Sequence, residues 1–195
     1  MVEMKRVVNM TYLWRIPDDY PRSLIGEYQR EGTPDRFLFK RSERVSGLAG
    51  LPKVKFDASC AKLRQFDCLS SNAQVPIVSP ALAEFLLRFA SNDVQLMKLD
   101  INGTDGSIGD YFLLNVVKKV LCIDHKVSKY TLVPGTTEIM GFRQLSFLDN
   151  CMGEHALARD SEYLSHLLVS DRVADNLMRN GFHGVALVDP SDIAW

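Results

Sequence analysis

The chain has 195 residues, of which 46% are hydrophobic and 24% charged, and its formal net charge is −1. These values are ordinary for a globular protein and exclude a fibrous or disordered chain. A nearly neutral chain also lacks the positive field that attracts a protein to nucleic acid. No stretch approaches the ~20 apolar residues of a membrane span, and Met1–Arg6 lacks an apolar core behind its charges. We therefore expect a cytoplasmic protein without a signal peptide or membrane segment.

The four cysteines are widely spaced along the chain, at Cys60, Cys68, Cys122 and Cys151. In a cytoplasmic protein we expect them to be reduced thiols. The short motifs that cradle phosphates (GxxxxGK[ST], GxGxxG) or hold zinc (HExxH, Cys-x-x-Cys) do not occur. Cys151 and His155 have a spacing that could suit a metal, but two side chains of a surface loop are the simpler interpretation. The sequence thus predicts no cofactor and no metal.

The N-terminal part of the chain differs from the rest in charge and in its turn residues. Residues 1–55 carry a net charge of +4 and the remainder −5. Repeated Pro and Gly predict short strands and turns there. We expect a single domain over 1–195, in which 1–74 is a candidate N-terminal subdomain and 75–195 the core.

Basic and aromatic residues alternate in the segment from Arg36 to Arg41. This pattern predicts an edge strand with Phe37 and Phe39 facing inward and cations facing solvent. A nucleic-acid or scaffold module that uses the stretch Arg36–Arg44 is the alternative. The strand is preferred because the whole chain is not basic.

The clearest predicted elements begin with a short apolar strand at Val75–Val78. Ser79 then reads as an N-cap and Pro80 as the first residue of a helix. Four apolar residues continue that helix with the spacing of one buried face: Leu82, Phe85, Leu86 and Phe89. Three elements are expected to follow: a strand over 94–101, a polar turn over 102–109, and a long buried strand over 111–124.

A second unit repeats this order near the end of the chain. The strand at Leu167–Val169 precedes a cap at Ser170, an amphipathic helix, a C-terminal Gly181 and a strand over 184–188. The two cap-and-helix segments share a nine-residue pattern, which a common capping solution or an internal duplication explains. Two strand–helix–strand units predict an α+β (or α/β) fold, a mixed β-sheet with a few packed helices.

Acidic residues gather in the segment 149–162, which contains four acids and one arginine between apolar stretches. We interpret it as a mobile loop that meets a basic partner, because complementary charge speeds association. The turn before the long strand is a weaker acidic candidate. The candidate partner-binding residues are Asp149, Glu154, Asp160, Glu162, Asp105 and Asp110.

An enzyme would have to use a constellation without a known signature. Cys122 and His125 are the nearest candidates for a nucleophile and its base. However, a thiol late in an apolar strand usually behaves as a small hydrophobic side chain. The sequence therefore predicts a protein that is not an enzyme and keeps this pair as an alternative.

The chain contains an ordered set of short strings: Pro76-Ile77-Val78-Ser79, Asp93-Val94-Gln95, Tyr111-Phe112-Leu113-Leu114-Asn115-Val116, Cys122-Ile123-Asp124, Ser128-Lys129-Tyr130, Leu168-Val169-Ser170-Asp171 and Gly181-Phe182-His183-Gly184. Together these strings resemble family eleven of the immunity proteins from bacterial polymorphic-toxin systems. The resemblance covers residues 75–188 well and the N-terminal third loosely. Asp124 and Ser128 within it are expected to clasp a turn.

The resemblance implies protection of a bacterium during competition between bacteria. The expected partner is the C-terminal domain of a cognate secreted toxin, often a nuclease, with no nucleic acid bound directly. We expect inhibition by occlusion of the toxin's active site, with acidic side chains of 149–162 facing its cations. The resemblance carries over no agreed set of toxin-binding residues.

Overall fold

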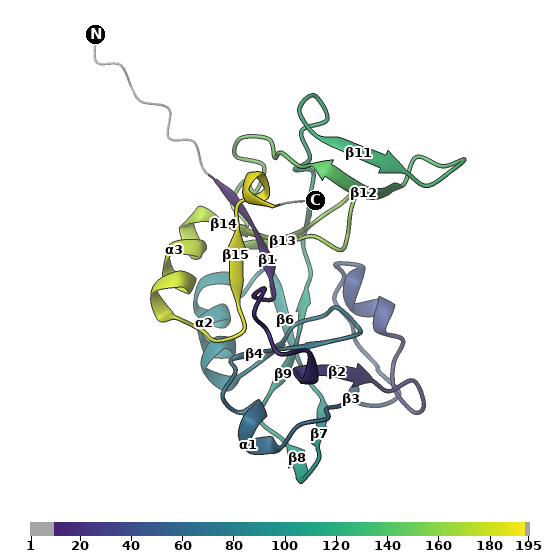
Figure 1. Cartoon of the computed structure of the whole chain (residues 1–195), viewed down its shortest axis with the longest axis vertical. Coiled ribbons are helices and arrows are strands. Elements are labelled where there is room, and N and C mark those ends of the chain that lie inside the picture. Colours follow the sequence, from purple (N-terminus) through teal and green to yellow (C-terminus); the bar gives the residue numbers. More distant parts are fainter. Residues whose placement is uncertain (1–9, 194–195) are drawn as a thin grey trace.

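The computed structural model describes residues 10–193, so the segment Met1–Arg6, assessed above for a signal peptide, lies outside the described residues. Within this range the protein is mostly β, with fifteen strands in three sheets and three short α-helices. Figure 1 shows the two larger sheets stacked along the long axis, with α2 and α3 on one side of the molecule. No helix in this part of the chain has the length and apolar character to cross a membrane.

The first large sheet contains five strands in the order β10-β13-β14-β1-β15. All neighbours are antiparallel except the parallel pair β10 and β13. The strands are β1 (Thr11–Arg15), β10 (Lys119–Val120), β13 (Leu157–Asp160), β14 (Leu167–Ser170) and β15 (Ala186–Val188). The first strand of the chain therefore lies between its last two.

The second large sheet contains eight short strands in the order β6-β9-β5-β4-β2-β3-β7-β8. The strands are β2 (Ile25–Tyr28), β3 (Lys53–Lys55), β4 (Cys68–Ser71), β5 (Ile77–Val78), β6 (Val94–Lys98), β7 (Asp100–Gly103), β8 (Gly106–Ile108) and β9 (Phe112–Val116). Because β4 pairs with β5, the boundary expected at residue 74 falls between two paired strands.

A third, two-stranded sheet is the hairpin of β11 (Lys129–Leu132) and β12 (Ile139–Gln144). The helices are α1 (Cys60–Leu63), α2 (Pro80–Ala90) and α3 (Asp171–Asn180), with 3₁₀ turns η1 (Arg22–Leu24), η2 (Arg36–Lys40) and η3 (Pro190–Asp192).

The fold-class prediction of an α+β or α/β protein is wrong, because strands dominate the described chain. Many of these strands have only two to four residues, too few to show a period of two in a sequence. The predicted strand over 94–101 is two strands, since the chain changes partner from β9 to β3 at Leu99. The predicted turn over 102–109 contains a hairpin, and the predicted strand over 111–124 ends at Val116 before the short β10.

Both predicted long helices are present. Ser79 caps α2, since its Oγ accepts a hydrogen bond from the Leu82 N–H at 3.3 Å. Gly181 ends α3 with a φ of 63°, the left-handed conformation that glycine adopts without strain. Ser170 stands at the start of α3, but its side chain accepts no capping bond from the helix.

Each of these helices joins two strands that flank a third. The crossover β5–α2–β6 spans β9, and β14–α3–β15 spans β1. The apolar faces of both helices meet in one core between the two large sheets, which includes Trp14, Leu82, Leu86, Leu157 and Leu177. A second core fills the eight-stranded sheet, and a third lies under the hairpin.

Candidate partner-binding surface

A stapled arm is the most distinctive surface feature of the described chain. We use "the arm" for residues 122–151, which leave the body after β10, form the β11–β12 hairpin and return before β13. In Figure 1 the hairpin projects from the top of the molecule. A disulfide between Cys122 and Cys151 joins the two ends, whose Cα atoms lie 5.0 Å apart. The expectation of four reduced thiols is therefore wrong for this pair, because a separation of 29 residues conceals that the arm returns to its origin.

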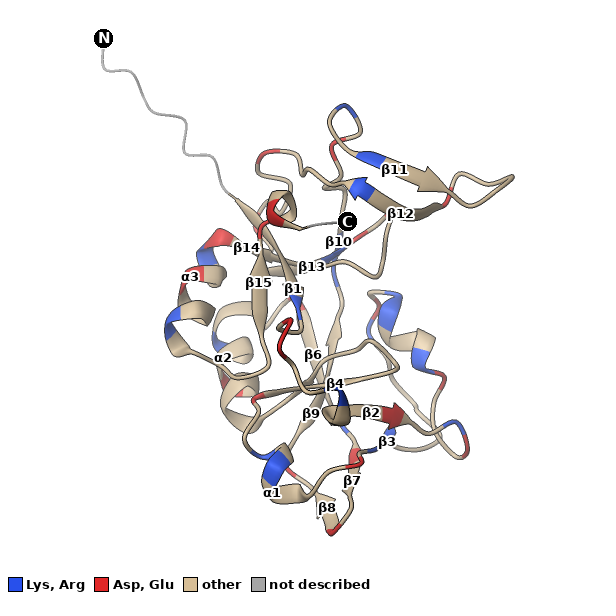
Figure 2. Ribbon diagram, viewed as in Figure 1, with Lys and Arg blue, Asp and Glu red and all other residues tan. Residues whose placement is uncertain are grey.

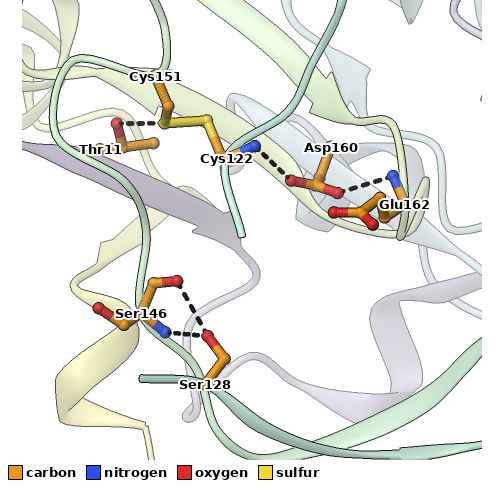
Figure 3. Close-up of a disulfide and its surroundings, with 7 residues drawn as sticks. All are labelled: Thr11, Cys122, Ser128, Ser146, Cys151, Asp160 and Glu162. Carbon is orange, nitrogen blue, oxygen red and sulfur yellow. Dashed lines mark hydrogen bonds between the residues drawn. A yellow bond between two sulfur atoms is a disulfide. The ribbon is translucent and has the colours of Figure 1, made fainter. Parts of the chain in front are cut away.

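Backbone and hydroxyl groups close the base of the arm beyond the disulfide (Figure 3). The Leu148 N–H donates to the Cys122 carbonyl at 2.7 Å, and the Asp124 N–H to the Ser146 carbonyl at 2.9 Å. Ser128 Oγ donates to that same carbonyl at 3.1 Å and accepts the Ser146 N–H at 3.0 Å. The arm is thus fastened at several points and not by its disulfide alone.

The turn clasp predicted for Asp124 and Ser128 is confirmed. Asp124 Oδ1 accepts the Lys126 N–H at 2.9 Å. Its backbone carbonyl accepts the Ser128 N–H at 2.8 Å. This side-chain-to-backbone bond is the usual way in which Asp stabilises a turn.

Aromatic side chains anchor the hairpin to the body. Phe142 of β12 is 9% exposed, and its ring centroid lies 6.0 Å from Tyr130, 5.3 Å from Tyr163 and 5.2 Å from His166. Burial, aided by the charge of Arg15, lowers the pKa of His166 to about 4. A two-stranded hairpin is marginal by itself, so these contacts give the arm its fixed position.

Two β-bulges shape β12, the second strand of the hairpin. Pairing passes from Thr131–Gly141 to Leu132–Ile139 and from Lys129–Gln144 to Tyr130–Phe142. The residues left out of the ladder are Met140, which is 58% exposed, and Arg143, which is also exposed. A bulge re-aims side chains and increases local twist. The hairpin therefore presents an apolar and a cationic side chain to solvent.

Exposed apolar side chains are concentrated around the arm. Of the thirteen large hydrophobic residues that are exposed within residues 10–193, five lie between positions 121 and 148. They are Leu121, Val127, Leu132, Met140 and Leu148. Apolar surface gathered on one projecting element is typical of a protein–protein contact. Figure 2 shows both signs of charge on the hairpin, so the arm is not a single-sign patch.

Three of the predicted acidic residues lie at or near the base of the arm. Asp149 is an exposed residue of the arm itself. Glu162 accepts a hydrogen bond from His125 Nε2 at 2.8 Å, while His125 Nδ1 lies 2.8 Å from the Tyr130 hydroxyl. Glu154 is exposed, and its backbone carbonyl accepts a hydrogen bond from Arg172. These acids are available to a partner.

Asp160 requires a correction, because segment 149–162 is not one mobile loop. Its residues 157–160 form β13, and Asp160 is 0% exposed. The carboxylate accepts backbone N–H groups from Cys122 at 3.1 Å, Glu162 at 2.8 Å and Tyr163 at 3.1 Å. Burial raises its pKa. Asp160 organises the base of the arm (Figure 3) and is not a surface contact.

Asp105 and Asp110 lie at the opposite end of the molecule, beside α1 and β8 (Figures 1 and 2). Asp105 Oδ1 accepts the Cys60 N–H at 2.7 Å, and backbone and side-chain hydrogen bonds from Cys60 lower the pKa of Asp105. Asp110 pairs with Arg64 at 3.0 Å. The structure therefore does not join these two residues to the 149–162 acids in one surface.

One of the two alternative sites, the pair Cys122 and His125, loses its chemical basis. Cys122 is 0% exposed and bonded to Cys151, so it offers no thiolate for His125 to activate. The predicted edge strand around Phe37 is the 3₁₀ turn η2, with Phe39 in the core at 0% exposure.

Two cations of that stretch, and the histidine of the metal-like spacing, have local partners. Arg36 donates to the Asn72 carbonyl at 2.9 Å and Lys40 to Gln74 Oε1 at 2.7 Å. His155, the partner of Cys151 in the metal-like spacing, bonds to Asp93 through Nδ1 at 3.0 Å.

Sequence reasoning missed the arm, although one signal for it was present. Pro134-Gly135 stands between two stretches that become β11 and β12, and a Pro-Gly pair marks a turn. Nothing in the sequence indicates that Cys122 and Cys151 meet, because that contact depends on the whole path of the chain.

Comparison with known families completes the description. A family model described as "Immunity protein family (Imm11)" matches residues 6–192, nearly the whole chain. No curated protein matches the sequence.

Proposed function

The chain belongs to the Imm11 immunity protein family, and from this premise we propose that it binds a cognate toxin domain and neutralises it by covering the toxin's active site. The single observation that carries the proposal is the family match over residues 6–192. Membership supports a binding protein with a toxin as its partner. The identity of the toxin, and the way in which it is inhibited, belong to the proposal.

We propose that the arm is the principal contact surface. Three observations support this choice: it projects from the body, it carries a concentration of exposed apolar side chains, and its base is held by a disulfide and hydrogen bonds. An arm fixed before binding loses little conformational freedom when it meets a partner, which favours tight association. Its width as a two-stranded ribbon suits entry into a cleft.

Asp149, Glu154 and Glu162 form the second part of the proposed contact surface. Their carboxylates are exposed or partly exposed near the arm, and would meet cations around the toxin's cleft. Charges at the rim of an interface mainly accelerate association. In this proposal the apolar arm supplies most of the affinity for the toxin, and the acidic side chains mainly increase the rate of association.

The first test is co-purification. The tagged protein is expressed together with the C-terminal domain of the toxin encoded beside it, and we expect a complex of equal stoichiometry. That toxin domain should kill cells when it is expressed alone and spare them when this chain is present. Failure to form a complex with a toxic neighbour would contradict the proposed partnership.

The second test localises the contact with two matched methionines. Met140 on the arm and Met178 on α3 are 58% and 51% exposed. We expect Met140→Asp to weaken toxin binding at least tenfold, about 1.4 kcal/mol, and Met178→Asp to leave binding unchanged. Titration calorimetry on the purified pair measures both. Equal effects of the two substitutions would remove the arm from the proposal.

The third test concerns charge. Replacing Asp149, Glu154 and Glu162 by Lys should slow association about tenfold at low salt, with a smaller effect at high salt. The matched control replaces Glu27, Glu31 and Glu84, three exposed acids outside the arm, by Lys and makes the same change in net charge. If both triple variants associate equally slowly, the effect belongs to overall charge and not to these positions.

The compartment of neutralisation is also a proposal. The sequence favours the cytoplasm, whereas disulfides persist mainly in oxidising compartments. Cells are quenched rapidly with acid, and the free thiols are then alkylated. The alkylation state of Cys122 and Cys151 decides between the two compartments. If Cys122 and Cys151 are alkylated, the protein works as a dithiol in the cytoplasm; if they are protected, it works where the disulfide survives.

A further inference from the structure

A cavity of about 370 Å³ lies at the junction of the two large sheets. β1 contributes Trp14 and Arg15, β4 contributes Ser70, and β13 contributes Arg159. Tyr163, from the loop after β13, also lines the cavity. The volume falls within the range of sites for small ligands, and the mixture of aromatic and polar walls is typical of them.

Arg159 is the unusual member of this lining. It is 1% exposed, and the only hydrogen bond of its side chain among the described residues runs from Nη1 to the Leu164 carbonyl at 2.8 Å. Nε and Nη2 are buried without a partner within residues 10–193, and no carboxylate in that range pairs with the guanidinium. A buried cation is normally kept only when it is paired. The unmatched charge therefore needs an explanation.

The geometry of the free donors indicates which chemistry would match them. Nε and Nη2 form one edge of the guanidinium, whose two parallel N–H bonds fit two oxygens of a carboxylate or a phosphate. The cavity's other lining groups add donors but no acid, since neither Asp nor Glu lines it. An oxyanion would satisfy Arg159 where the protein itself does not.

Further cations surround this cavity. Arg15 lies in its lining, and Lys40 approaches through Gln74, whose Oε1 accepts its ammonium at 2.7 Å. Burial lowers the pKa of Lys40, and the charges of Arg159 and Arg36 lower it further. Such a cluster within low-dielectric walls concentrates positive potential and attracts an anion.

We infer that this cavity binds a small oxyanion, a carboxylate or phosphate on a compact body, held by the Nε–Nη2 edge of Arg159 with Trp14 and Tyr163 as its walls. Both nitrogens are buried, so the oxyanion reaches them as the lining side chains shift. The inference does not rest on the proposed toxin contact, although Tyr163 also packs against Phe142 of the arm.

The experiment titrates the full chain with three probes of one shape: benzoate, phenyl phosphate and neutral benzamide. We expect one of the two anions to bind with 1:1 stoichiometry and at least tenfold more tightly than benzamide. Whichever anion binds more tightly identifies the source of the oxyanion. Arg159→Met should weaken that binding at least tenfold, and Arg159→Lys, which keeps the charge but loses the two-donor edge, should weaken it as well. Arg179→Met, at an exposed position of α3, is the matched control and should bind as the unaltered protein does.

The melting temperature of each variant shows whether a loss of anion binding results from unfolding of the protein. Since Arg159→Met removes an unpaired buried charge, the variant should unfold at the same temperature as the unaltered protein or higher. Should it fail to fold, the exposed Arg15→Met provides the test, and it should weaken anion binding.

Three results would overturn the inference. The first is no binding of either anion. The second is anion binding that none of the substitutions at Arg159 or Arg15 reduces. The third is that the unaltered protein binds neither anion while Arg159→Met loses toxin binding. This result would assign Arg159 to a carboxylate of the protein partner.

Discussion

At the scale of the residue, Gly184 marks the closest approach between two elements. Its φ is +89°, and a β carbon added there would lie 2.2 Å from the Cys68 carbonyl oxygen. The chain is held this close because the backbone N–H groups of Asp67 and Cys68 both donate to the His183 carbonyl, at 2.9 and 3.0 Å. This position joins the start of β4 to the segment that leads into β15.

We expect Gly184→Ala to destabilise the protein by at least about 3 kcal/mol, from the clash and the strained backbone together. Gly181→Ala is the control, because φ is also positive there but nothing lies within 4 Å of the added carbon. It should cost about 1 kcal/mol. Chemical denaturation measures both. Equal losses in the two variants would show that the contact with Cys68 can relax.

His166 makes stability depend on pH. Its folded-state pKa of about 4 lies below the ordinary histidine pKa of 6.5, so between these values the unfolded chain holds the proton and the folded chain does not. Stability is therefore lost as pH falls from about 6.5 toward 4, by up to about 3 kcal/mol.

The measurement is the slope of unfolding free energy against pH. His166→Gln should flatten this slope between pH 4 and 6.5, whatever it does to stability at neutral pH. A slope unchanged by His166→Gln would mean that another group titrates.

At the scale of the element, the arm is held by three kinds of contact: a disulfide, hydrogen bonds at its base and an aromatic anchor. Closing a loop of 29 residues restricts the unfolded chain by about 3–4 kcal/mol in the chain-entropy model. The hydrogen bonds and ring contacts act in the folded state alone. The disulfide thus contributes chiefly to stability, and the other contacts to position.

This division predicts the behaviour of a Cys122→Ser/Cys151→Ser variant. We expect it to lose about 3 kcal/mol of stability while its affinity for the toxin falls less than threefold, because the base and the anchor persist. Cys60→Ser, at a free cysteine, should change neither quantity. Loss of toxin binding by a folded double variant would mean that the disulfide itself sets the position of the arm.

The elements that could be predicted from the sequence are those with strong local signals. The two long helices follow from their caps and apolar spacing around Ser79 and Gly181. η2 was mistaken for a strand, since the alternation of Phe37 and Phe39 fits a strand, whereas only Phe39 is buried. The surface role predicted for Asp160 is wrong because its carboxylate binds the backbone of Cys122 and of the loop that follows β13. The contact with Cys122 cannot be recognised from the local sequence.

At the scale of the whole molecule, both large sheets are built from distant parts of the chain. β1 pairs with β14 and β15, and β4 pairs with β5 across residue 74. These pairings have no local signature, which is why the sequence suggested helices packed on a sheet instead of a mostly β protein. Family membership was accessible from the ordered strings, because a resemblance does not require the pairings to be known.

The same pairings predict that the chain does not divide into independent parts. A fragment of residues 75–195 lacks β1 and β4, which leaves unpaired edges on β14, β15 and β5. We expect no cooperative thermal unfolding from this fragment by circular dichroism, and recovery of a cooperative transition when 1–74 is added. A cooperative transition from 75–195 alone would establish it as a separate folding unit.

The placement of β1 between β14 and β15 also has a consequence for biosynthesis. Thr11 lies opposite Ser170, so the first strand leaves the ribosome long before its neighbours exist. The five-stranded sheet can close only after β15 has been made, and contacts of such separation form slowly. Under the proposed function, a nascent copy therefore gives a cell no protection. Neutralisation would depend on finished molecules accumulated before the toxin arrives.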